Sequence, residues 1–422
     1  MRQGAEAMAG RSVPESGTDQ PEGGAGLSGF GGRAAGTHWY DVAVAGAGPA
    51  GALLGYHLAC RGIRVLILDK KPFPRYKACG GGLTLRAMRS LPFDISPVVE
   101  DYTRTACMGF MDQCLHSLSF DHPVIAMVMR DRFDHFLVTE AVRKGARFQD
   151  ATSLEGVAGD PGNLRVSTSR GQIRARVLAG ADGVNSRAAR ILGLSVRSRY
   201  MTAMEGEVRV RRPMDLDRFR GRVHYDFGII AQGYGWVFPK KDHLSVGVGT
   251  FSRNARGWRG CFDDYLRLKG LDGGRNQPVK GHLIPVRPWS GNTLACPRGL
   301  VLGDAAGYAD PLTGEGLFYA IRQADMASQV IQEALNRGYD ALAGYTGLIH
   351  REFGPDSRAA SLMADLIYRF PGLGRRILSA HAADLAGNQL AVICGKLSYT
   401  RLLRHLIGRI LNPMQSLPVL FQ

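Results

Sequence analysis

The sequence lacks the features that mark membrane-spanning, secreted and zinc-binding proteins. It has no run of about 18 apolar residues, so no segment is expected to span a bilayer. Its first residues include no apolar stretch of the kind that a secretory signal needs. The 7 cysteines form an odd set without a Cys-x-x-Cys pair. We therefore expect free thiols in a reducing cytoplasm, with no disulfide framework and no metal site.

Acidic residues are scarce relative to basic ones. The chain has 53 Lys and Arg against 37 Asp and Glu, which gives a formal net charge of +16. Such an excess suits nucleic acid, anionic lipid or a phosphorylated substrate. No nucleic-acid-binding motif accompanies the charge, so we expect no nucleic-acid partner and favour lipid or a phosphorylated small molecule.

Residues 1–38 also lack apolar periodicity. Ten of them are glycine, and we expect a disordered tail. A Gly-x-Gly-x-x-Gly match at residues 24–29 follows no strand pattern and is interpreted as chance. At the other end, Leu417–Gln422 resembles a protease-recognition scar and is left out of the interpretation.

The most informative stretch is residues 40–69. An apolar run enters a Gly-x-Gly-x-x-Gly turn, a helical pattern follows, and a second apolar run ends on Asp69. This order is the dinucleotide-binding fingerprint. Gly46 permits the tight turn, Gly48 lets the backbone approach a pyrophosphate, and Gly51 lets the helix pack closely on the strand. Asp69 is placed to accept hydrogen bonds from a ribose.

The rest of the chain predicts a divided domain with a sheet inserted into it. Period-two patterns over residues 203–250 indicate an antiparallel sheet, and a long helix is expected from about residue 314 to 336. Helical patterns continue to residue 411, with interruptions expected at Pro355 and Pro371. We predict an α/β (α+β) fold whose parts are a Rossmann-type domain at 39–100, 125–195 and 285–335, a β-sheet substrate domain at 101–124 and 196–284, and a helical region at 336–422.

Four segments in this order resemble the geranylgeranyl reductase family. These are flavoproteins of the aromatic-hydroxylase (glutathione-reductase-like) fold that saturate isoprenoid double bonds. The first and last segments are shared by many FAD enzymes, whereas the second and third are specific to the family. One departure is Ala231, where the family's third motif opens with proline. The segments are residues 46–51, Lys77–Leu83 with its Cys-Gly-Gly-Gly run, Tyr234–Lys240, and Gly303–Gly316.

The resemblance implies a bound FAD. Asp304 is expected near the ribityl chain and pyrophosphate, or alternatively as the cap of the turn that follows it. Backbone N–H groups of residues 314–316 are expected to stabilise the reduced isoalloxazine, unless they form only a glycine helix start. Arg130 matches a family arginine near the cofactor, with a solvated surface arginine as the alternative. The predicted cofactor-binding residues are Gly46, Gly48, Ala50, Gly51, Asp69, Lys70, Cys79, Gly80, Arg130, Asp182, Asp304, Gly314, Glu315 and Gly316, with Asp182 bracing the backbone.

The third segment carries the substrate prediction. Tyr234, Trp236 and Phe238 alternate along a predicted strand, so they share one face. They form either an apolar wall for an isoprenoid chain or the core face of an ordinary sheet. The glycines at 233 and 235 favour the wall, because glycine in a strand often marks close approach of a ligand. The predicted substrate-binding residues are Tyr234, Gly235, Trp236 and Phe238.

The predicted catalytic residues are Cys79, Tyr234 and Trp236. An isolated alkene has no carbonyl to accept charge, so hydride transfer must be coupled to protonation, with positive character building at a tertiary carbon. Aromatic faces stabilise a cation by roughly 0.5–2 kcal/mol each. Cys79 is the candidate proton donor or gate, with an inert buried thiol as the alternative and Tyr234 as a second donor. His243 is expected to be structural.

The electron donor and the cellular context stay open. No second nicotinamide fingerprint is present, which agrees with NADPH binding transiently or with ferredoxin. An apolar stripe along residues 402–411 lies among arginines, as in a basic helix that rests on an anionic membrane. Docking of this stripe on the protein body is the alternative. We expect a cytoplasmic monomer, peripheral at a membrane, that binds an isoprenoid or prenyl lipid.

Two other functions compete with this interpretation. A flavin-dependent monooxygenase or halogenase has the same fold, although the Cys-Gly-Gly-Gly loop has no place in that scheme. A non-catalytic lipid or flavin carrier would leave the redox motifs idle. Oxygen consumption with flavin turnover discriminates the first alternative from a reductase.

Overall fold

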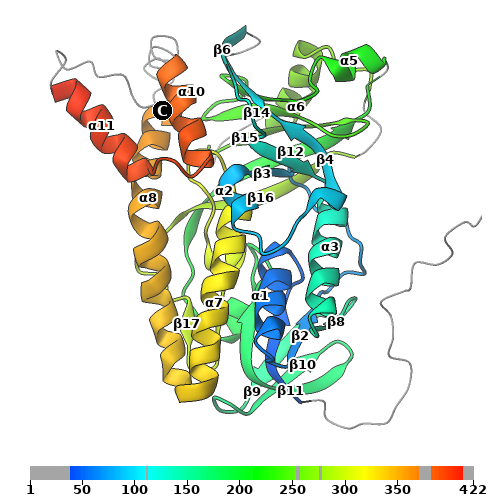
Figure 1. The fold of residues 1–422 in the computed structure, drawn as a ribbon, viewed down its shortest axis with the longest axis vertical. Coiled ribbons are helices and arrows are strands. Elements are labelled where there is room, and N and C mark those ends of the chain that lie inside the picture. The colour runs from blue at the N-terminus through cyan, green and yellow to red at the C-terminus, as the bar shows by residue number, and fades with distance from the viewer. Residues whose placement is uncertain are drawn as a thin grey trace, which may run out of the picture. The chain divides into compact units, whose positions relative to one another are not determined.

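The computed structural model describes residues 39–110, 113–210, 212–252, 257–274, 278–369 and 382–411 (Figure 1). The predicted tail, Pro371 and Leu417–Gln422 lie outside these ranges. The mixed α/β architecture, with a Rossmann-like first sheet and a helical C-terminal region, confirms the predicted fold class. The boundaries of the predicted domains stay predictions.

The first sheet has the order β17-β18-β11-β1-β2-β8, and β9 and β10 extend it through β11. Strands β1, β2, β8, β11 and β18 run parallel, and β17 is antiparallel to β18. Nearly continuous apolar runs suit strands that are covered on both faces. The strands are β1 (Trp39–Ala45), β2 (Val65–Leu68), β8 (Arg147–Gln149), β9 (Leu154–Ala158), β10 (Leu164–Thr168), β11 (Gly171–Gly180), β17 (Ala295–Cys296) and β18 (Gly299–Val301).

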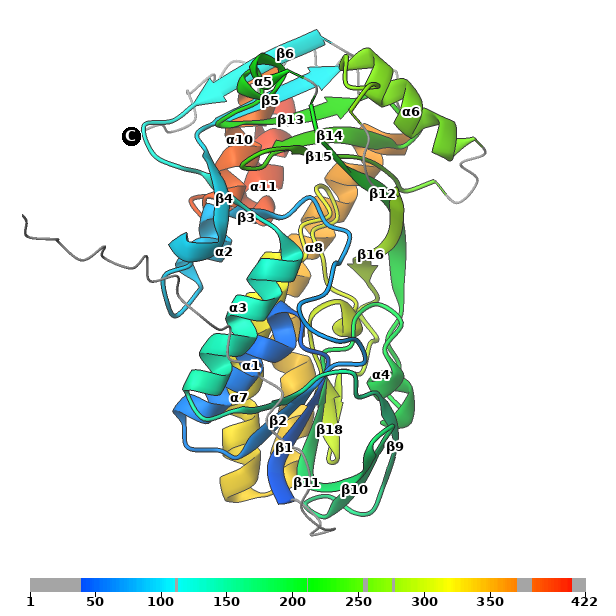
Figure 2. The same ribbon diagram turned by 90° about the vertical axis from the view of Figure 1, so that its right-hand side faces the viewer.

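Alternation along β1 divides the core into two. Val42 and Val44 pack in the cluster shared with helices α1 (Pro49–Cys60), α3 (Arg130–Arg143) and α7 (Leu317–Arg337), which lie together in Figures 1 and 2. Ala43 and Ala45 face the cluster of β9, β10 and the short helix α4 (Arg187–Ile191). The long helix begins three residues later than residue 314, because Gly314 takes a left-handed φ of 73° and Gly316 is the N-cap.

The second sheet has the order β16-β12-β15-β14-β13-β5-β6. It is antiparallel as predicted except that β5 and β13 run parallel. Its outer face packs on helix α6 (Trp258–Leu268) through Val237, Val246 and Val248, and α5 (Pro213–Asp217) adds Leu216 to this cluster. The strands are β5 (Thr105–Phe110), β6 (Gln113–Ser119), β12 (Ser198–Val208), β13 (Arg222–Phe227), β14 (Gly233–Pro239), β15 (Leu244–Thr250) and β16 (Lys280–Pro288).

A small third sheet and several short turns complete the part that surrounds the site. The sheet has the order β3-β7-β4 and follows the glycine-rich loop. The elements are β3 (Gly82–Thr84), α2 (Leu85–Arg89), η1 (Ser96–Val98), β4 (Val99–Thr103), β7 (Ile125–Val128), η2 (Gly303–Ala306) and η3 (Tyr339–Ala343).

The C-terminal region contains helices α8 (Gly344–Arg369), α10 (Ala382–Ile393) and α11 (Tyr399–Leu411). The expected interruption at Pro355 is wrong, because α8 continues through it. Pro355 and Arg351 are both exposed, so water can satisfy the carbonyl that the missing proline N–H leaves free. Leu402 is buried and α11 packs on α8, so this part of the stripe docks on the protein body.

The prediction of free thiols throughout is also wrong. Cys107 and Cys114 form a disulfide within the β5–β6 hairpin. The register pairs Gly109 with Cys114 across a bulge, which brings the two side chains together although their spacing matches no motif. The described residues include no cluster of three or more His, Cys, Asp or Glu side chains that could hold a metal ion. No helix in the same ranges has the length and apolarity needed to cross a membrane.

Candidate active site

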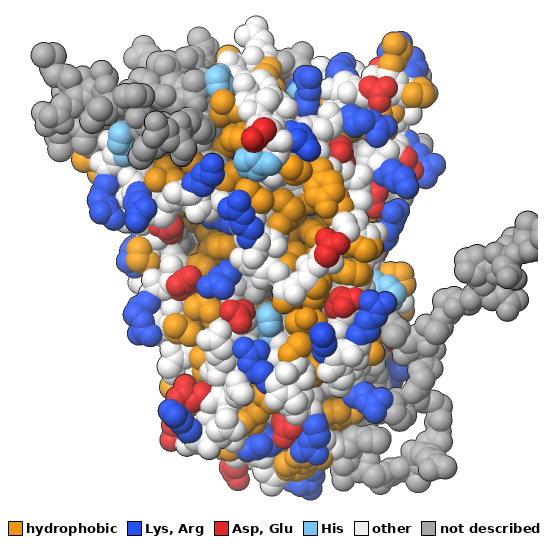
Figure 3. Space-filling model, in the orientation of Figure 1, with side chains coloured by type: hydrophobic (Ala, Val, Ile, Leu, Met, Phe, Trp, Pro, Cys, Tyr) orange, Lys and Arg blue, Asp and Glu red, His pale blue; other side chains and the backbone are white. Residues whose placement is uncertain are grey.

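A cavity of about 1140 Å³ lies between the first and second sheets. It exceeds the roughly 300–1,000 Å³ of common small-ligand sites, so it has room for a large cofactor and a second molecule. Its lining comes from the β1–α1 turn, the loop at 75–82, residues 181–185, strands β12, β14 and β16, and residues 302–317. Figure 3 shows apolar side chains gathered in the middle of the face that carries α2, with Lys and Arg scattered around them.

Two helices begin at this cavity without a side-chain cap. The N-caps are Gly48 for α1 and Gly316 for α7, and neither end receives a capping hydrogen bond from a described side chain. Their first-turn N–H groups and positive dipole ends are therefore available to an anionic ligand. Gly48, predicted from the fingerprint to lie at the pyrophosphate, and Gly316, predicted from the resemblance to lie at the isoalloxazine, both line the cavity.

The glycines of the first turn are required by close backbone packing. Gly46 has a φ of 102°, and a Cβ there would lie 2.2 Å from the carbonyl oxygen of Ala181. A Cβ at Gly51 would lie 1.9 Å from the oxygen of Gly46. Asp69 directly follows β2 and accepts hydrogen bonds from the N–H groups of Ala47 and Lys71, both at 3.0 Å. Its carboxylate is thus held at the cavity wall where a ribose is expected.

The side chain of Glu315 forms a buried ion pair with Arg86. Its carboxylate accepts from Arg86 Nη2 and from Thr84 Oγ1, each at 2.5 Å. Asp310 lies 3.3 Å from the same guanidinium. The N–H groups of Gly314 and Glu315 donate to the carbonyl oxygen of Asp310 (2.9 Å) and to Thr313 Oγ1 (3.3 Å). Of the three predicted N–H groups, this leaves that of Gly316 to face a cofactor, and its role stays a prediction.

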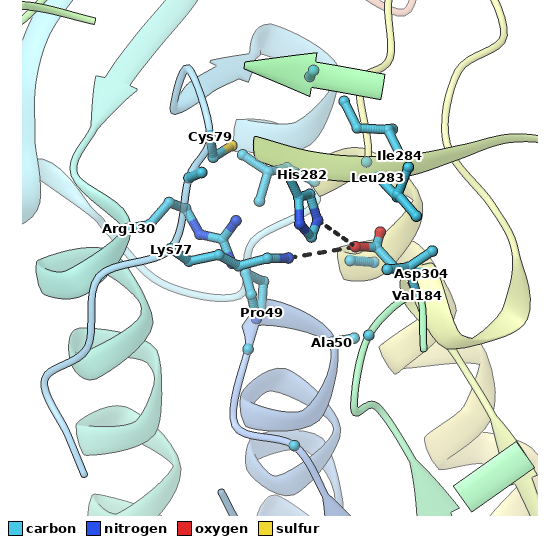
Figure 4. A pocket seen from close by; sticks show the side chains of 18 of the residues that line it. Pro49, Ala50, Lys77, Cys79, Arg130, Val184, His282, Leu283, Ile284 and Asp304 are labelled. Carbon is cyan, nitrogen blue, oxygen red and sulfur yellow. Dashed lines mark hydrogen bonds and ion pairs between the residues drawn. The ribbon is translucent and has the colours of Figure 1, made fainter. Parts of the chain in front are cut away.

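Arg130 is not a solvated surface arginine. Its side chain is 5% exposed and forms two hydrogen bonds to Asp134, at 2.8 and 2.9 Å. Arg75 reaches the same carboxylate at 2.9 Å. Arg130 lines the cavity beside the loop that carries Cys79 (Figure 4), so the alternative interpretation is excluded.

The glycine-rich loop is anchored by a residue to which the sequence analysis gave no role. Lys240 is 1% exposed, and its Nζ donates to the carbonyl oxygens of Gly80 (2.7 Å) and Val128 (3.1 Å). Burial lowers the pKa of Lys240, although nearby glutamates oppose this effect. Cys79 and Gly80 line the cavity as a result of this anchoring. The signal in the sequence is a lysine that directly follows an apolar strand.

Asp304 stands at the centre of a second charged group. Lys77 Nζ lies 3.4 Å and His282 Nε2 lies 3.8 Å from its Oδ2, and both contacts converge on Asp304 in Figure 4. Burial alone would raise the pKa of Asp304, but Lys77 and His282 hold it below its usual value. Asp304 therefore stays ionised at neutral pH. Lys77 and His282 were not predicted as site residues.

The aromatic residues of β14 form one row along the cavity. The ring centroids of Tyr234 and Trp236 are 6.0 Å apart, and those of Trp236 and Phe238 are 6.4 Å apart. All three rings are buried and line the cavity. The Tyr234 hydroxyl donates to the carbonyl oxygen of Thr313, and burial raises its pKa well above the usual value.

Gly235 does not face the cavity, contrary to the prediction. A Cβ at this position would lie 2.7 Å from the ring of Tyr265, on the outer face of the sheet. The reason is the pleat, which turns residue 235 away from its neighbours 234 and 236. The close approach that glycine signals here is to a core tyrosine.

Asp182 braces the backbone, as the resemblance implied. It accepts hydrogen bonds from Ser186 Oγ (2.5 Å) and from the N–H groups of Arg187 (2.7 Å) and Ala188 (3.0 Å). These bonds hold the start of α4. Asp182 also lines the cavity, together with Ala50 and Lys70.

This combination fits FAD. The glycine turn leaves no space for a Cβ, two uncapped helix ends supply donors for phosphate and for a charged ring, and Asp69 is positioned for a ribose. Known proteins agree with this fit. A model described as an FAD binding domain matches residues 39–347. A digeranylgeranylglycerophospholipid reductase of Methanothermobacter thermautotrophicus is 30% identical over 335 residues, which are 75% of this chain and 83% of that protein.

The chain belongs to the geranylgeranyl reductase family. An uncharacterised protein of Methanosarcina barkeri is also similar, at 35% identity over 71% of this chain and 76% of that protein. The protein is thus an FAD-dependent oxidoreductase of this family. Among solved structures, a geranylgeranyl bacteriochlorophyll reductase-like protein of Thermoplasma acidophilum has a TM-score of 0.69 at 22% identity, covering 90% of this chain and 98% of that one. A flavin-dependent brominase has a TM-score of 0.67 at 18% identity, over 88% of this chain and 99% of that one, so the fold is shared beyond the family.

Proposed function

We propose that this geranylgeranyl reductase family member saturates carbon–carbon double bonds of a polyprenyl chain. The reaction adds a hydride from reduced flavin to one alkene carbon and a proton to the other. The observation that carries the proposal is the arrangement of one cavity. A row of buried aromatic rings lies on one side of it, and two uncapped helix ends lie on the other.

The aromatic row suits the charge that this reaction develops. FAD, when bound, supplies the hydride. Trp236 and Tyr234 are buried and line the cavity, where an aromatic ring stabilises a cation over its face by roughly 0.5–2 kcal/mol. Cys79, in the loop held by Lys240, is our candidate for proton delivery or gating. Because the Tyr234 hydroxyl is engaged with Thr313, Tyr234 is the weaker donor.

We infer that the electrons come from NADPH binding transiently or from ferredoxin.

We further infer that the protein acts as a cytoplasmic monomer at the surface of a membrane, where prenyl lipids reside. Large apolar side chains remain exposed on the C-terminal helices, namely Leu362, Leu366 and Ile407, the last at 47%. Such side chains favour contact with the apolar part of a lipid surface. Binding to anionic vesicles tests this inference.

The function is tested by incubating dithionite-reduced protein anaerobically with prenyl lipids and analysing the products by mass spectrometry. A reductase adds two hydrogen atoms for each double bond. A monooxygenase or halogenase, the alternative on this fold, would be inactive without oxygen. A product that gains oxygen or halogen only in air would overturn the proposal in favour of that alternative.

We predict that Trp236→Ala abolishes most alkene saturation while the yellow cofactor stays bound. Loss of the ring removes cation stabilisation and frees the substrate to shift, and a displacement of about 1 Å already costs about 100-fold in rate. Single-turnover assays with the reduced protein measure this effect, and flavin absorbance measures cofactor content. Trp289→Ala is the control, because Trp289 is 50% exposed and outside the cavity lining. Full activity of Trp236→Ala would overturn our proposal that the aromatic row of β14 acts in the reaction.

A further inference from the structure

A line of polar side chains crosses the second sheet from the cavity toward the surface. Glu205 is 2% exposed and lines the cavity. It pairs with Gly247 of β15, which in turn pairs with Trp236 of β14. A Cβ at Gly247 would lie 2.0 Å from the Trp236 ring, so the indole lies over this glycine. A buried carboxyl group on β12 therefore lies on the same face as the proposed catalytic row on β14, with only β15 between them.

The cavity end of this line is Tyr76. Its hydroxyl donates to Glu205 Oε1 at 3.2 Å, and Ser245 Oγ donates to the same oxygen at 3.3 Å. The second oxygen, Oε2, is buried and has no hydrogen-bond partner among the described residues. Tyr76 itself lines the cavity. Burial, together with Glu205, raises the pKa of Tyr76 well above its usual value, so its hydroxyl carries a proton.

The middle of the line is a pair of carboxyl groups. Glu207 lies two residues beyond Glu205 on the same face of β12 and is also buried. The Oε2 atoms of both side chains are buried without a hydrogen-bond partner among the described residues. An ionised carboxylate can only accept hydrogen bonds, so a proton on Glu205 reduces the repulsion between the two groups. Burial and the neighbouring Glu207 raise the pKa of Glu205 to about 8. Glu205 therefore holds a proton at neutral pH.

The outer end of the line is His243. Its Nε2 lies 3.1 Å from Glu207 Oε2, an ion-pair contact without hydrogen-bond alignment. Its Nδ1 lies 2.7 Å from Asp242, whose side chain is 63% exposed. Burial would lower the pKa of His243, but the two carboxylates hold it above its usual value. The imidazole can thus exchange protons between the exposed Asp242 and the buried pair.

Other charged groups also face this line. Lys240 interacts with both glutamates, and Lys280 Nζ lies 4.0 Å from the centre of the Tyr76 ring. The remaining neighbours are Cys79 beside Tyr76, Glu100 near Lys240, and Arg209 near Asp242. Lys240 opposes protonation of Glu205, but burial and Glu207 outweigh its effect on the pKa.

We propose that His243, Glu207, Glu205 and Tyr76 form a proton relay that carries protons from the surface into the cavity. The proposal rests on the proposed function, because each saturation breaks one π bond, forms two C–H bonds, and consumes one hydride and one proton. The hydride comes from the reduced cofactor, and the proton must be regained from solvent. Tyr76 releases its hydroxyl proton toward the cavity and takes the proton of Glu205. Glu207 and then His243 replace that proton from solvent at Asp242.

The principal test is Glu205→Gln, which keeps the shape and the polar contacts but cannot relay a proton. Saturation by pre-reduced protein should fall about 100-fold, within the range of general acid–base effects. The wild-type rate should fall as the pH rises through about 8, because Glu205 then loses its proton. In Glu205→Gln this alkaline limb should disappear. If Glu205→Gln kept both the wild-type rate and the decrease in rate above about pH 8, the relay would be overturned.

Infrared spectroscopy of the flavin-free protein supplies a readout that does not depend on activity. At neutral pH the wild type should show the C=O stretch of a protonated carboxyl group, and the band should be lost above about pH 8. Glu205→Gln should lack it. Glu100→Gln is the matched control, since the Glu100 side chain is 3% exposed but is outside the cavity lining. It should keep both the band and the rate, whereas loss of the band in both variants would overturn the assignment to Glu205.

His243→Ala tests the outer end. The rate should fall several-fold and recover when imidazole is added to the buffer, which a purely structural role of His243 would not produce. If imidazole did not restore the rate of His243→Ala, His243 would not be the point at which protons enter the relay. If the wild type reduces no prenyl lipid but shows the infrared band, the proposed function fails and the protonated carboxyl stands. If the wild type reduces lipid and the band is absent, the relay fails and the function stands.

Discussion

The two sides of the cavity differ in the groups that line them, which are backbone groups on one side and side chains on the other. The side formed by the first sheet is mainly backbone, with glycines at 46, 48 and 51 and uncapped N–H groups at two helix ends. The side formed by the second sheet is mainly side chains, with a row of aromatic rings and buried Glu205 and Lys240. Backbone groups recognise a phosphate or a ring through position alone. Side chains are needed where charge and protons must be handled during a reaction.

The two sides therefore differ in what they require from their neighbours. The backbone side needs space, because a Cβ at Gly46 or Gly51 would overlap backbone atoms. The side-chain side needs partners, because a buried polar or charged group without a hydrogen-bond partner is unfavourable. Lys240 finds its partners in two carbonyl oxygens, and Glu205 finds them in Tyr76 and Ser245.

The largest effect is expected at Gly46. Gly46→Ala places a Cβ 2.2 Å from the Ala181 oxygen at a φ of 102°, so the turn must shift, at a cost of about 3 kcal/mol or more from strain and overlap together. Both thermal stability and flavin content should fall sharply. Gly145→Ala is the control, because Gly145 has a φ of 106° with no atom within 4 Å of the added Cβ. It should cost only about 1–2 kcal/mol. Equal loss in the two variants would mean that strain, and not the shape of the turn, decides flavin binding.

The backbone side was largely predictable from the sequence, and the side-chain side was not. The glycine turn and Asp69 belong to one local motif, so spacing alone placed them. Tyr76 and Glu205 are 129 residues apart in the chain, and no periodicity indicates that they meet. Gly235 was misassigned because a glycine in a strand signals a close contact without saying on which face the contact lies.

The same difference explains the other errors. The Cys107–Cys114 disulfide depends on hairpin register, which a seven-residue spacing does not reveal. The aromatic row was predicted because alternation in a strand is local. Lys240 directly follows that row, but its targets, Gly80 and Val128, come from two other parts of the chain.

A smaller effect is expected when a methyl group is added on the side-chain side. Gly247→Ala places a Cβ 2.0 Å from the Trp236 ring, and such overpacking costs about 1–3 kcal/mol. The ring must move, so alkene saturation should fall while the flavin content stays unchanged. Single-turnover rates and flavin absorbance separate the two effects. Gly156→Ala, in β9, is the control, because its nearest contact is an ordinary 3.9 Å. Loss of flavin from Gly247→Ala would show that the two sides are not independent.

An effect no larger than that at Gly247, and confined to stability, is expected at Asp304, where a charged side chain stands on the backbone side. In flavin-free protein at neutral pH, Asp304→Asn should lower the free energy of unfolding by about 1–3 kcal/mol, since it weakens charged contacts to Lys77 and His282. The folded-state pKa of Asp304 is lowered, so its contribution is present above the unfolded pKa of about 3.9 and is lost as the pH falls further.

Denaturant unfolding from pH 7 down to pH 3 measures this contribution. The gap between wild type and Asp304→Asn should persist down to about pH 4 and then narrow. Below the unfolded pKa of about 3.9, Asp304 takes up a proton in the unfolded wild type but stays ionised in the folded one, which favours unfolding. Asp160→Asn, at an exposed position, should stay within about 0.5 kcal/mol of the wild type throughout. A gap that stays constant below pH 4 would mean that Asp304 acts through shape and hydrogen bonding alone. The stability of the first-sheet side of the cavity would then not depend on an ionised side chain. Buried groups that carry a charge or a titratable proton would matter only on the second-sheet side.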